Sequence, residues 1–419
     1  MNNFDALGLP ESLMHTLQNM QFYKPTPIQA QAIPLAIKGK DILGSAQTGT
    51  GKTAAFGIPL LVKLMKEIET TALVMAPTRE LASQVVKQLQ IMAGKKSSIR
   101  ACLLIGGEPM HKQLRQLKNK PRLIVGTPGR INDHLKRKTL KLDNSKFLVL
   151  DETDRMLDMG FEDQIETIIK FMPEQRQTLL FSATIPPEIK KITKKYLIEP
   201  IRVSVDVENS VAKKVTQIIL RTTERDKYEK FLNQIADRTG SILVFMRTKH
   251  STEKMAAKLT KEGYKASAIN GDLRQNKRER VINNFRNKKY RILVATDVAS
   301  RGLDIPHIEH VINYDLPECP EDYVHRIGRT GRAGAEGSAL CFITPSDKRK
   351  WDAIDKLLNP NRKPKFNRKK TKLEETSKVK NKKNLQPNTR KKTSFKPKKK
   401  KNNLFKRQKQ NNSNQMRTI

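Results

Sequence analysis

The stretch DILGSAQTGTGKTAAFGIPLL, Asp41 to Leu61, decides the fold of the first half of the chain. A short apolar run leads into a loop rich in glycine and threonine, and a longer apolar segment follows. This order of strand, loop and helix is typical of a phosphate-binding loop, whose glycines let backbone N–H groups surround phosphate oxygens. We therefore predict a nucleotide site made by Ala46, Gln47, Thr48, Gly49, Thr50, Gly51, Lys52 and Thr53.

Within this loop, two side chains have distinct expected roles. Lys52 offers a positive charge to the β- and γ-phosphates of a nucleotide, and Thr53 offers a hydroxyl to Mg²⁺. Ala46 stands where the usual pattern has its first glycine, so the strict spacing of that pattern is not met. The order of the elements around the loop still favours nucleotide binding over a chance glycine-rich turn.

A second stretch, FLVLDETD from Phe147 to Asp154, crowds three carboxylates behind a buried strand. Like charges at this spacing repel, so a positive partner is expected nearby. If the strand belongs to the same sheet as the loop, Asp151 can hold Mg²⁺ and Glu152 can orient and deprotonate a water molecule. Acidic residues also favour the first turn of a helix, which is the structural alternative for this cluster.

Short apolar runs alternate with amphipathic stretches over most of the chain, as expected for parallel strands joined by helices. They are DILGSA, TALVMAP, ACLLIGG, RLIVGTP, KFLVLDE and QTLLFSA, then VTQIILR, SILVFMR, KASAING, RILVATD, HVINYDL and SALCFIT. Their apolar character indicates strands buried on both faces. We predict an α/β fold with two tandem parallel-sheet domains, at residues 1–205 and 215–357, joined by a linker at 206–214.

The net charge of +40, with 82 Lys and Arg against 42 Asp and Glu in 419 residues, indicates a polyanionic partner. The segment 361–419 alone carries 23 Lys and Arg against two Glu. So charged a segment buries too little apolar surface to offset its ordering entropy. We therefore predict a disordered basic tail at 358–419 that acts as a functional arm for a polyanion, which on charge alone could be RNA, DNA or an acidic surface. A merely solubilising tail is the alternative.

Three cysteines, Cys102, Cys319 and Cys341, show no metal-binding or disulfide spacing, and we expect them to be small core residues. The N-terminus MNNFDALGLPESL lacks a basic segment followed by an apolar one. No stretch approaches the roughly 18 apolar residues of a membrane span. These features predict a soluble, cytoplasmic protein without a membrane partner.

Taken in order, the motifs resemble those of the DEAD-box RNA helicases of superfamily 2, from about Phe4 to Trp351. The resemblance implies two RecA-like domains of the P-loop NTPase type, with ATP and Mg²⁺ as cofactors and RNA as partner. In FYKPTPIQ, it implies that Gln29 bonds to adenine and that Phe22 stacks on the ring. Gln21 departs from the family, in which a glycine commonly precedes that aromatic residue.

The resemblance also implies an RNA path along the ends of several strands. The motifs are PTREL at residues 77–81, the Gly106–Gly107 pair, the turn at residues 127–130, FMRT at 245–248, Gly271–Asp272 followed by QNKR, and ATDVASRGLDIP. Strand ends of this kind present N–H groups, hydroxyls and arginines to phosphate oxygens. The implied RNA contacts are Thr78, Arg79, Gly107, Thr127, Pro128, Arg130, Arg247, Gly271, Gln275, Arg278 and Thr296.

Other residues are expected to link nucleotide and RNA. Asp154, Ser182, Thr184 and His325 would couple the two sites, and Asp304 would hold the ribose of ATP. In HRIGRTGR, Arg329 and Arg332 would reach the γ-phosphate and complete a catalytic set with Lys52, Asp151 and Glu152. The metal ligands would be Thr53 and Asp151. Thr153 replaces the family's alanine; we expect activity to survive this change, with altered coupling to Ser182 and Thr184.

The expected activity is ATP-driven local unwinding of short RNA duplexes, or remodelling of RNA–protein complexes, by a monomer whose two domains close on ATP and single-stranded RNA. Two alternatives stay open. One is an ATP-dependent RNA clamp or scaffold that does not unwind, and the other is a DNA helicase, against which the adenine-binding motif argues. The basic tail resembles that of bacterial members which act with ribosomal particles in ribosome assembly, with RNA-decay proteins, or on cold-stabilised RNA.

Overall fold

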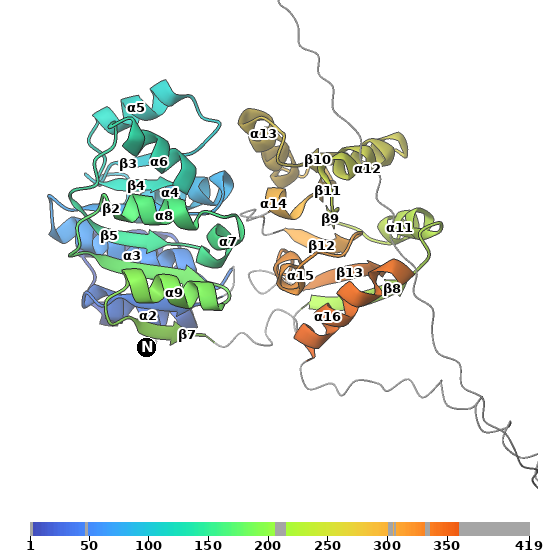
Figure 1. Ribbon diagram of the computed structural model, residues 1–419, viewed down its shortest axis with the longest axis horizontal. Coiled ribbons are helices and arrows are strands. Elements are labelled where there is room, and N and C mark those ends of the chain that lie inside the picture. The colour runs from blue at the N-terminus through green and yellow to red at the C-terminus, as the bar shows by residue number, and fades with distance from the viewer. Residues whose placement is uncertain are drawn as a thin grey trace, which may run out of the picture. The chain divides into compact units, whose positions relative to one another are not determined.

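The computed structural model describes residues 3–46, 49–205, 215–300, 305, 307–331 and 336–359. All of them belong to one compact unit, which runs from Met1 to Arg362. The predicted linker and most of the predicted tail lie outside the described residues. Two parallel sheets organise the rest, and we call β1–β7 with their helices the first lobe and β8–β13 with their helices the second lobe (Figure 1).

The first lobe contains a seven-stranded sheet in the order β3-β4-β2-β5-β6-β1-β7, in which every pair is parallel. Its strands are β1 (Ile42–Ser45), β2 (Thr71–Met75), β3 (Ala101–Leu104), β4 (Leu123–Gly126), β5 (Ser145–Leu150), β6 (Gln177–Ser182) and β7 (Ile201–Ser204). Its helices are η1 (Asp5–Leu7), α1 (Glu11–Asn19), α2 (Pro27–Ile37), α3 (Lys52–Lys66), α4 (Arg79–Ala93), α5 (Met110–Lys118), α6 (Pro128–Lys136), α7 (Thr153–Asp158), α8 (Glu162–Ile169) and α9 (Pro187–Tyr196).

Apolar side chains of the first sheet alternate between two cores. On one face Val74 and Phe147 pack with α2, α3 and α4, and on the other Leu73 and Leu148 pack with α6, α8 and α9. A strand covered on both faces has no polar face, which explains the continuous apolar runs in the sequence. The edge strand β7 is partly exposed, so its apolar run is shorter and was not among the predicted strands.

The second lobe repeats the arrangement with a six-stranded parallel sheet in the order β10-β11-β9-β12-β13-β8. Its strands are β8 (Val215–Arg221), β9 (Ser241–Phe245), β10 (Ala266–Ile269), β11 (Ile292–Ala295), β12 (Ile308–Asn313) and β13 (Gly337–Ile343). Its helices are α11 (Lys227–Ala236), α12 (Lys249–Lys261), α13 (Gln275–Arg286), α14 (Asp297–Ser300), α15 (Pro320–Ile327), η2 (Pro345–Asp347) and α16 (Lys348–Leu358).

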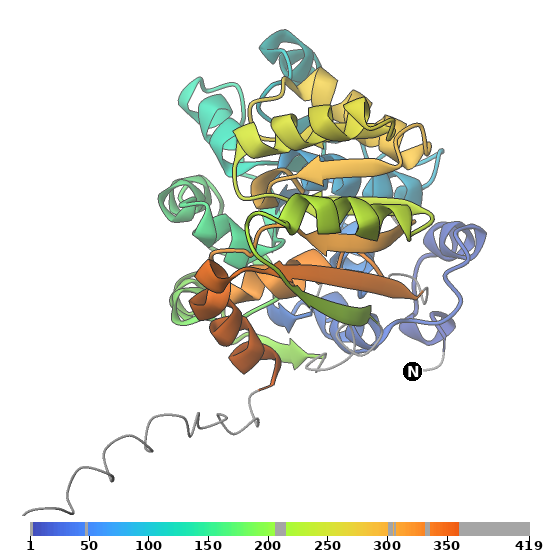
Figure 2. The same cartoon turned by 90° about the vertical axis from the view of Figure 1, so that its right-hand side faces the viewer.

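Both faces of the second sheet are also covered. Helices α11 and α12 pack on one face, which is turned towards the viewer in Figure 2, whereas α13 and α15 pack on the other. The prediction of two tandem parallel sheets is therefore confirmed. In the part of the chain that the structure describes, no helix has the length and apolar character that crossing a bilayer requires.

The cysteine prediction is only partly confirmed. Cys102 on β3 and Cys341 on β13 are fully buried, and burial raises the pKa of each thiol to about 12. Cys319 is exposed, because it precedes the first turn of α15 and does not point into a sheet core. The expectation of a core position was wrong for that residue.

The backbone at Gln21 bears on a departure from the pattern of the family that the sequence resembles. Gln21 lies between α1 and Phe22 with a φ of 60°, in the left-handed region. A residue with a Cβ pays roughly 1–2 kcal/mol there, whereas glycine adopts the conformation freely. The glycine that is common at this position therefore serves the turn, and Gln21 keeps the same turn under strain.

We predict that Gln21→Gly raises the free energy of unfolding by about 1 kcal/mol, because it removes the Cβ clash of the left-handed backbone. Urea unfolding of the full chain measures the change. Gln18→Gly, in the last turn of α1, is the matched control and should lower stability by up to about 1 kcal/mol through lost helix propensity. A Gln21→Gly protein that unfolds at lower urea than the wild type would contradict the interpretation.

Candidate nucleotide and RNA site

The phosphate-binding loop has the backbone that its glycines imply. Gly49 and Gly51 have φ values of 84° and 90°, and a Cβ on Gly51 would lie 2.4 Å from the side-chain nitrogen of Gln29. Ala46 is buried, its backbone N–H bonds to the carbonyl of Ser182, and its φ is not positive. Alanine therefore fits where the strict pattern has glycine. Gln47 and Thr48 lie outside the described residues.

Lys52 begins α3 and is only 7% exposed. Its ammonium group is buried and, among the residues that the structure describes, has no hydrogen-bond partner. A buried ammonium without partners is costly, so this position implies an anion that is absent from the protein itself. Together with the helix N-terminus and the glycine loop, it fits the phosphates of a nucleotide.

Asp151 follows β5 and is 2% exposed. Burial raises the pKa of this carboxyl to about 6, while the positive charge of Lys52 acts in the opposite direction and Glu152 adds repulsion. The cation that stabilises the charged form of Asp151 is therefore Lys52, which comes from a hundred residues earlier in the chain. The prediction that the two motifs belong to one sheet edge is confirmed.

The backbone of Glu152 is strained. Its φ and ψ of 49° and 52° are left-handed, and its N–H donates to Oδ1 of Asp151 at 3.0 Å. Left-handed non-glycine residues cost roughly 1–3 kcal/mol and cluster at functional sites. The strained turn holds Glu152 beside Asp151 at the point where β5 ends and α7 begins.

These residues are suited to Mg²⁺ bound with a nucleotide. Among the described residues, no group of three His, Cys, Asp or Glu side chains could hold a metal by itself. Mg²⁺ characteristically takes one or two protein carboxylates and completes its octahedron with water and phosphate oxygens. A single buried Asp151 with the hydroxyl of Thr53 at the loop matches that pattern.

Gln29 sits against the loop. Its Nε2 donates to the carbonyl of Gly51 at 3.0 Å, and its Oε1 accepts from the N–H of Thr26 at 2.9 Å. An amide has two N–H donors and an oxygen with two lone pairs, so one of each is left for a base edge. Phe22 is half-buried beside Phe4, with ring centroids 6.4 Å apart.

The third residue of the acidic motif faces the sheet. Thr153 is fully buried, and its hydroxyl lies 3.2 Å from the carbonyl of Leu150 on β5 and 3.3 Å from that of Phe181 on β6. The threonine thus lodges on backbone oxygens of two neighbouring strands, as expected from its size and its hydroxyl. Among the described residues, the hydroxyl bonds to these two carbonyls and not to the side chains of Ser182 or Thr184. The altered coupling expected from the sequence therefore has no direct contact to support it.

Asp154 connects the acidic motif to the end of β6. Its Oδ2 accepts from the N–H groups of Ala183 and Thr184, at 3.1 and 3.0 Å, and from the Thr184 hydroxyl at 3.1 Å. Ser182 donates to the carbonyl of Thr184 at 2.6 Å. The contact between Asp154 and this turn, which the sequence predicted, is present.

Seven of the eleven predicted RNA contacts line one cavity of about 390 Å³. It is built from the ends of strands and the starts of helices in both lobes. The seven are Thr78, Arg79, Thr127, Arg130, Gly271, Gln275 and Arg278. Gly107, Pro128, Arg247 and Thr296 do not line it, although a Cβ on Gly107 would lie 2.7 Å from the guanidinium of Arg79.

Arg278 is not an open phosphate ligand in this conformation. It is buried, its Nε bonds to Glu80 at 2.5 Å, and its other nitrogens donate to the carbonyls of Asn270 and Ala299. Arg79 reaches the side chain of Gln275 at 3.5 Å. Three residues expected to touch RNA, Arg79, Gln275 and Arg278, thus also join the lobes, and their RNA contacts stay predictions.

The sequence did not single out a further contact between the lobes. Arg155, directly after the acidic motif, bonds to Asp322 on α15 at 2.5 Å. The two side chains are only 7% and 13% exposed. The available signal was the position of Arg155 beside three acidic residues. Its partner, Asp322, lies 167 positions away and belongs to none of the recognised motifs.

In the last motif, Arg326 is buried, and each of its three guanidinium nitrogens donates a hydrogen bond within the second lobe. It pairs with Asp297, bonds to Asn313 and the carbonyl of Asp315, and stacks over Phe245. Arg329 is also buried, and His325 lies 4.0 Å from Asp322. Asp304 and Arg332 lie outside the described residues, so their predicted roles stay predictions.

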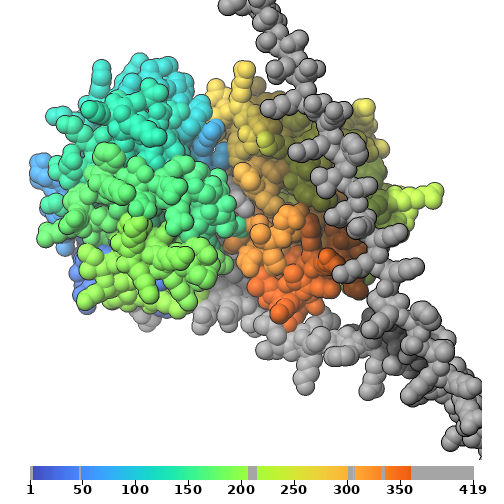
Figure 3. All heavy atoms as spheres, viewed as in Figure 1, coloured from blue at the N-terminus to red at the C-terminus, as the bar shows by residue number. Residues whose placement is uncertain are grey.

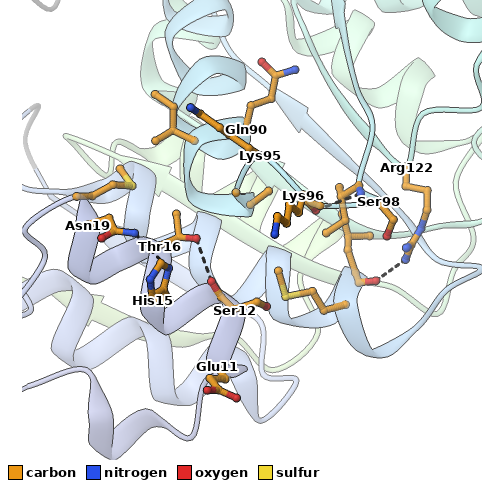
Figure 4. A pocket seen from close by; sticks show the side chains of 18 of the residues that line it. Glu11, Ser12, His15, Thr16, Asn19, Gln90, Lys95, Lys96, Ser98 and Arg122 are labelled. Atoms are coloured by element: carbon orange, nitrogen blue, oxygen red, sulfur yellow. Dashed lines mark hydrogen bonds between the residues drawn. The ribbon is translucent and has the colours of Figure 1, made fainter.

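A larger groove of about 1470 Å³ lies elsewhere in the first lobe. It runs between α1, the end of α4 and the residues that follow α4. Some of its side chains bond to one another or to nearby backbone, as Thr16 does to the carbonyl of Ser12 and Asn19 to His15 (Figure 4). None of the residues predicted from the sequence lines it. The candidate site is therefore the edge that carries Lys52, Asp151 and the smaller cavity.

Known proteins with the same arrangement give the family. The DEAD/DEAH box helicase profile matches residues 26–192, and the helicase conserved C-terminal domain profile matches residues 226–334. A DEAD-box ATP-dependent RNA helicase CshA of Bacillus cereus is 46% identical over 368 residues, which cover 85% of this chain and 70% of that protein.

Two further comparisons agree. An ATP-dependent RNA helicase CshA of Listeria monocytogenes is 47% identical over 350 residues, which cover 83% of this chain and 67% of the relative. The solved structure of Dbp5 of S. cerevisiae bound to RNA and ADP BeF3 matches with a TM-score of 0.77 and 34% identity, over 85% of this chain and 94% of Dbp5. The two parallel sheets of this chain therefore have the RecA-like fold that the sequence predicted. The chain therefore belongs to the DEAD-box family of ATP-dependent RNA helicases.

Proposed function

We propose that the protein hydrolyses ATP to ADP and phosphate and uses the cycle to separate short RNA duplexes locally or to remodel RNA–protein complexes. One observation carries the proposal: the buried ammonium of Lys52, which has no hydrogen-bond partner among the described residues, interacts electrostatically with the buried carboxylate of Asp151 at the same sheet edge. Family membership supports RNA as the partner, because the relatives are ATP-dependent RNA helicases.

In the hydrolysis step, a water molecule attacks the γ-phosphorus, and the bond from that phosphorus to the β–γ bridging oxygen breaks. Glu152 is the proposed acceptor of the water's proton, since its strained backbone holds it beside Asp151. Lys52 binds the β- and γ-phosphates, and Gln29 reads adenine with the N–H and lone pair it has left. Arg329 and Arg332 are the proposed γ-phosphate contacts from the second lobe, and Asp304 is the proposed ribose contact.

Mg²⁺, held by Asp151 and Thr53, would neutralise charge that develops on the phosphate oxygens. The protein's own part is to keep the Asp151 carboxylate ionised in a buried position, which the charge of Lys52 favours. Burial alone pushes this carboxyl towards its neutral form. Lys52 therefore prepares the metal site as well as the phosphate site.

RNA is proposed to bind along the cavity lined by both lobes, with Thr127 and Arg130 on one side and Gly271 and Gln275 on the other. Because ATP and RNA would each contact residues of both lobes, each should favour the closed arrangement that the other needs, and this coupling must be reciprocal. Asp154, which bonds to the turn at Thr184, is the proposed link between the two sites. Ser182 and His325 are proposed to assist it.

Several finer features of the proposal rest on the sequence. They are a cytoplasmic location, a monomeric state, no membrane partner, and domain limits at 205, 215 and 357. Ribosomal particles and RNA-decay proteins are further candidate partners. A strand-displacement assay on a short RNA duplex, with ATP and with a non-hydrolysable analogue, separates an unwinding enzyme from a clamp, and DNA-stimulated turnover would favour a DNA helicase.

Glu152→Gln should keep ATP and RNA binding but lower turnover by about 10²- to 10⁴-fold, because the amide cannot accept the proton of water. Phosphate release and RNA anisotropy measure the two properties. Glu162→Gln, an exposed change at the start of α8, is the matched control and should turn over normally. Phosphate release by Glu152→Gln at the wild-type rate would remove Glu152 from this role.

Thr153→Ala should leave turnover and its stimulation by RNA within about twofold of wild type, since the hydroxyl bonds to backbone and not to the site. The lost hydrogen bonds should lower the free energy of unfolding by about 1 kcal/mol. Thr153→Val, which keeps the shape without the hydroxyl, is the comparison. A tenfold change in the RNA concentration for half-maximal stimulation would instead give the hydroxyl a part in coupling.

Deletion of residues 361–419 should leave RNA-free turnover nearly unchanged and raise the RNA concentration needed for stimulation. The 23 basic residues contribute affinity through counterion release, so the truncated chain should also depend less on salt. Titrations of both chains with one RNA at matched salt test this. Superimposable curves would show that the tail does not contribute to RNA binding.

A further inference from the structure

Helices α5 and α6 carry a concentration of positive charge. From Met110 to Lys141 the chain has ten Lys and Arg residues and a single carboxylate, Asp133. That carboxylate is bonded to Arg137 at 2.7 Å, so it compensates only one of the ten. This part of the first lobe is therefore far more basic than the chain's average.

Six of these cations form what we call the α5–α6 basic face. Lys112, Arg115 and Lys118 recur every three residues along α5, which brings them to neighbouring positions on one side of that helix. Lys120 follows α5, Lys136 ends α6, and Lys138 lies just beyond it. All six are exposed, and within the described ranges none of them forms an ion pair.

The two helices form a continuous surface. Gln113 on α5 and His134 on α6 are buried and hydrogen-bonded at 3.2 Å, and Arg130 reaches back to the carbonyl of Glu108. The helices lie next to each other in the ribbon view, and their outer side forms part of the surface of the first lobe (Figures 1 and 3). An extended ligand that crosses both helices would therefore meet cations from each of them.

The basic face adjoins the RNA cavity. Thr127, Gly129, Arg130 and Asp133, before and within the first two turns of α6, line that cavity. The helix has nine residues and is about 14 Å long, and its far end carries Lys136. A chain of phosphates that leaves the cavity along α6 meets Arg130 near the start of the helix and Lys136 at its end, and the one carboxylate between them, Asp133, is paired with Arg137.

Helix dipoles explain only part of this charge. Cations in the last turn of a helix interact favourably with its C-terminus, which accounts for Lys118 and Lys136. Lys112, near the start of α5, is placed unfavourably for the dipole, and Lys120 and Lys138 lie beyond the helices. An external polyanion accounts for all six.

Resting on the RNA-dependent function proposed above, we propose that the α5–α6 basic face binds the phosphate backbone of RNA that extends beyond the nucleotides held in the cavity. Contacts of this kind add affinity without sequence preference. They give a long RNA an advantage over one that only fills the cavity.

The test compares two triple variants of the full chain. Lys112→Gln, Lys118→Gln and Lys136→Gln together remove charge from the basic face. Lys190→Gln, Lys191→Gln and Lys194→Gln remove the same charge from exposed positions on α9 and serve as the control. Each protein is titrated with a 6-nucleotide and a 20-nucleotide oligouridylate, in a non-hydrolysable ATP analogue, over a range of salt.

For the 20-nucleotide RNA, the basic-face variant should bind more weakly than the control. The negative slope of log affinity against log salt should become shallower by about two to three, because three phosphate contacts are lost. Its affinity for the 6-nucleotide RNA should match that of the control. Equal curves for both variants on the long RNA would overturn the proposal, as would an equal loss on the short RNA. Failure of the proposed function itself would differ, because neither RNA would then stimulate wild-type turnover.

Discussion

A buried carboxylate requires a positive charge nearby, and at Asp151 this requirement joins two segments that lie a hundred residues apart. Asp151 is almost fully buried, burial raises its pKa, and Lys52 provides the opposing charge. Lys52 in turn has no hydrogen-bond partner among the described residues, so the N–H donors of its ammonium group remain available for phosphate oxygens. The parallel sheet makes this possible, because β1 and β5 end at the same edge.

The same electrostatic rule applies between the lobes. Glu80 with Arg278, and Arg155 with Asp322, are ion pairs whose side chains are largely removed from water. Breaking one partner of a buried pair is costly, although the pair itself contributes little net stability. Such contacts are better suited to specifying an arrangement of the lobes than to strengthening it. Glu80 and Arg278 lie among the predicted RNA contacts, and Arg155 directly follows the acidic motif. A ligand bound at either place could therefore change how the two lobes are arranged.

Sequence reasoning predicted most of the fold, because strands covered on both faces leave continuous apolar runs that are easy to recognise. It missed β7, whose edge position leaves it half-exposed and short, and it misplaced Cys319, whose surroundings depend on a helix start. The nucleotide-binding residues were predictable because phosphate binding requires glycines, a lysine and a hydroxyl at fixed spacing within one short segment, residues 46–53. The pairs between the lobes were not, since a partner 167 or 198 residues distant leaves no periodic signal.

Departures from the family pattern have local physical explanations. Ala46 is tolerated because its backbone is not left-handed, whereas Gln21 carries strain because its backbone is. Thr153 is accommodated because two strand carbonyls lie within reach of its hydroxyl. In each case the local backbone decides whether the substituted side chain is strained or accommodated. Substitutions at motif positions can thus change stability while leaving the chemistry to Lys52, Asp151 and Glu152.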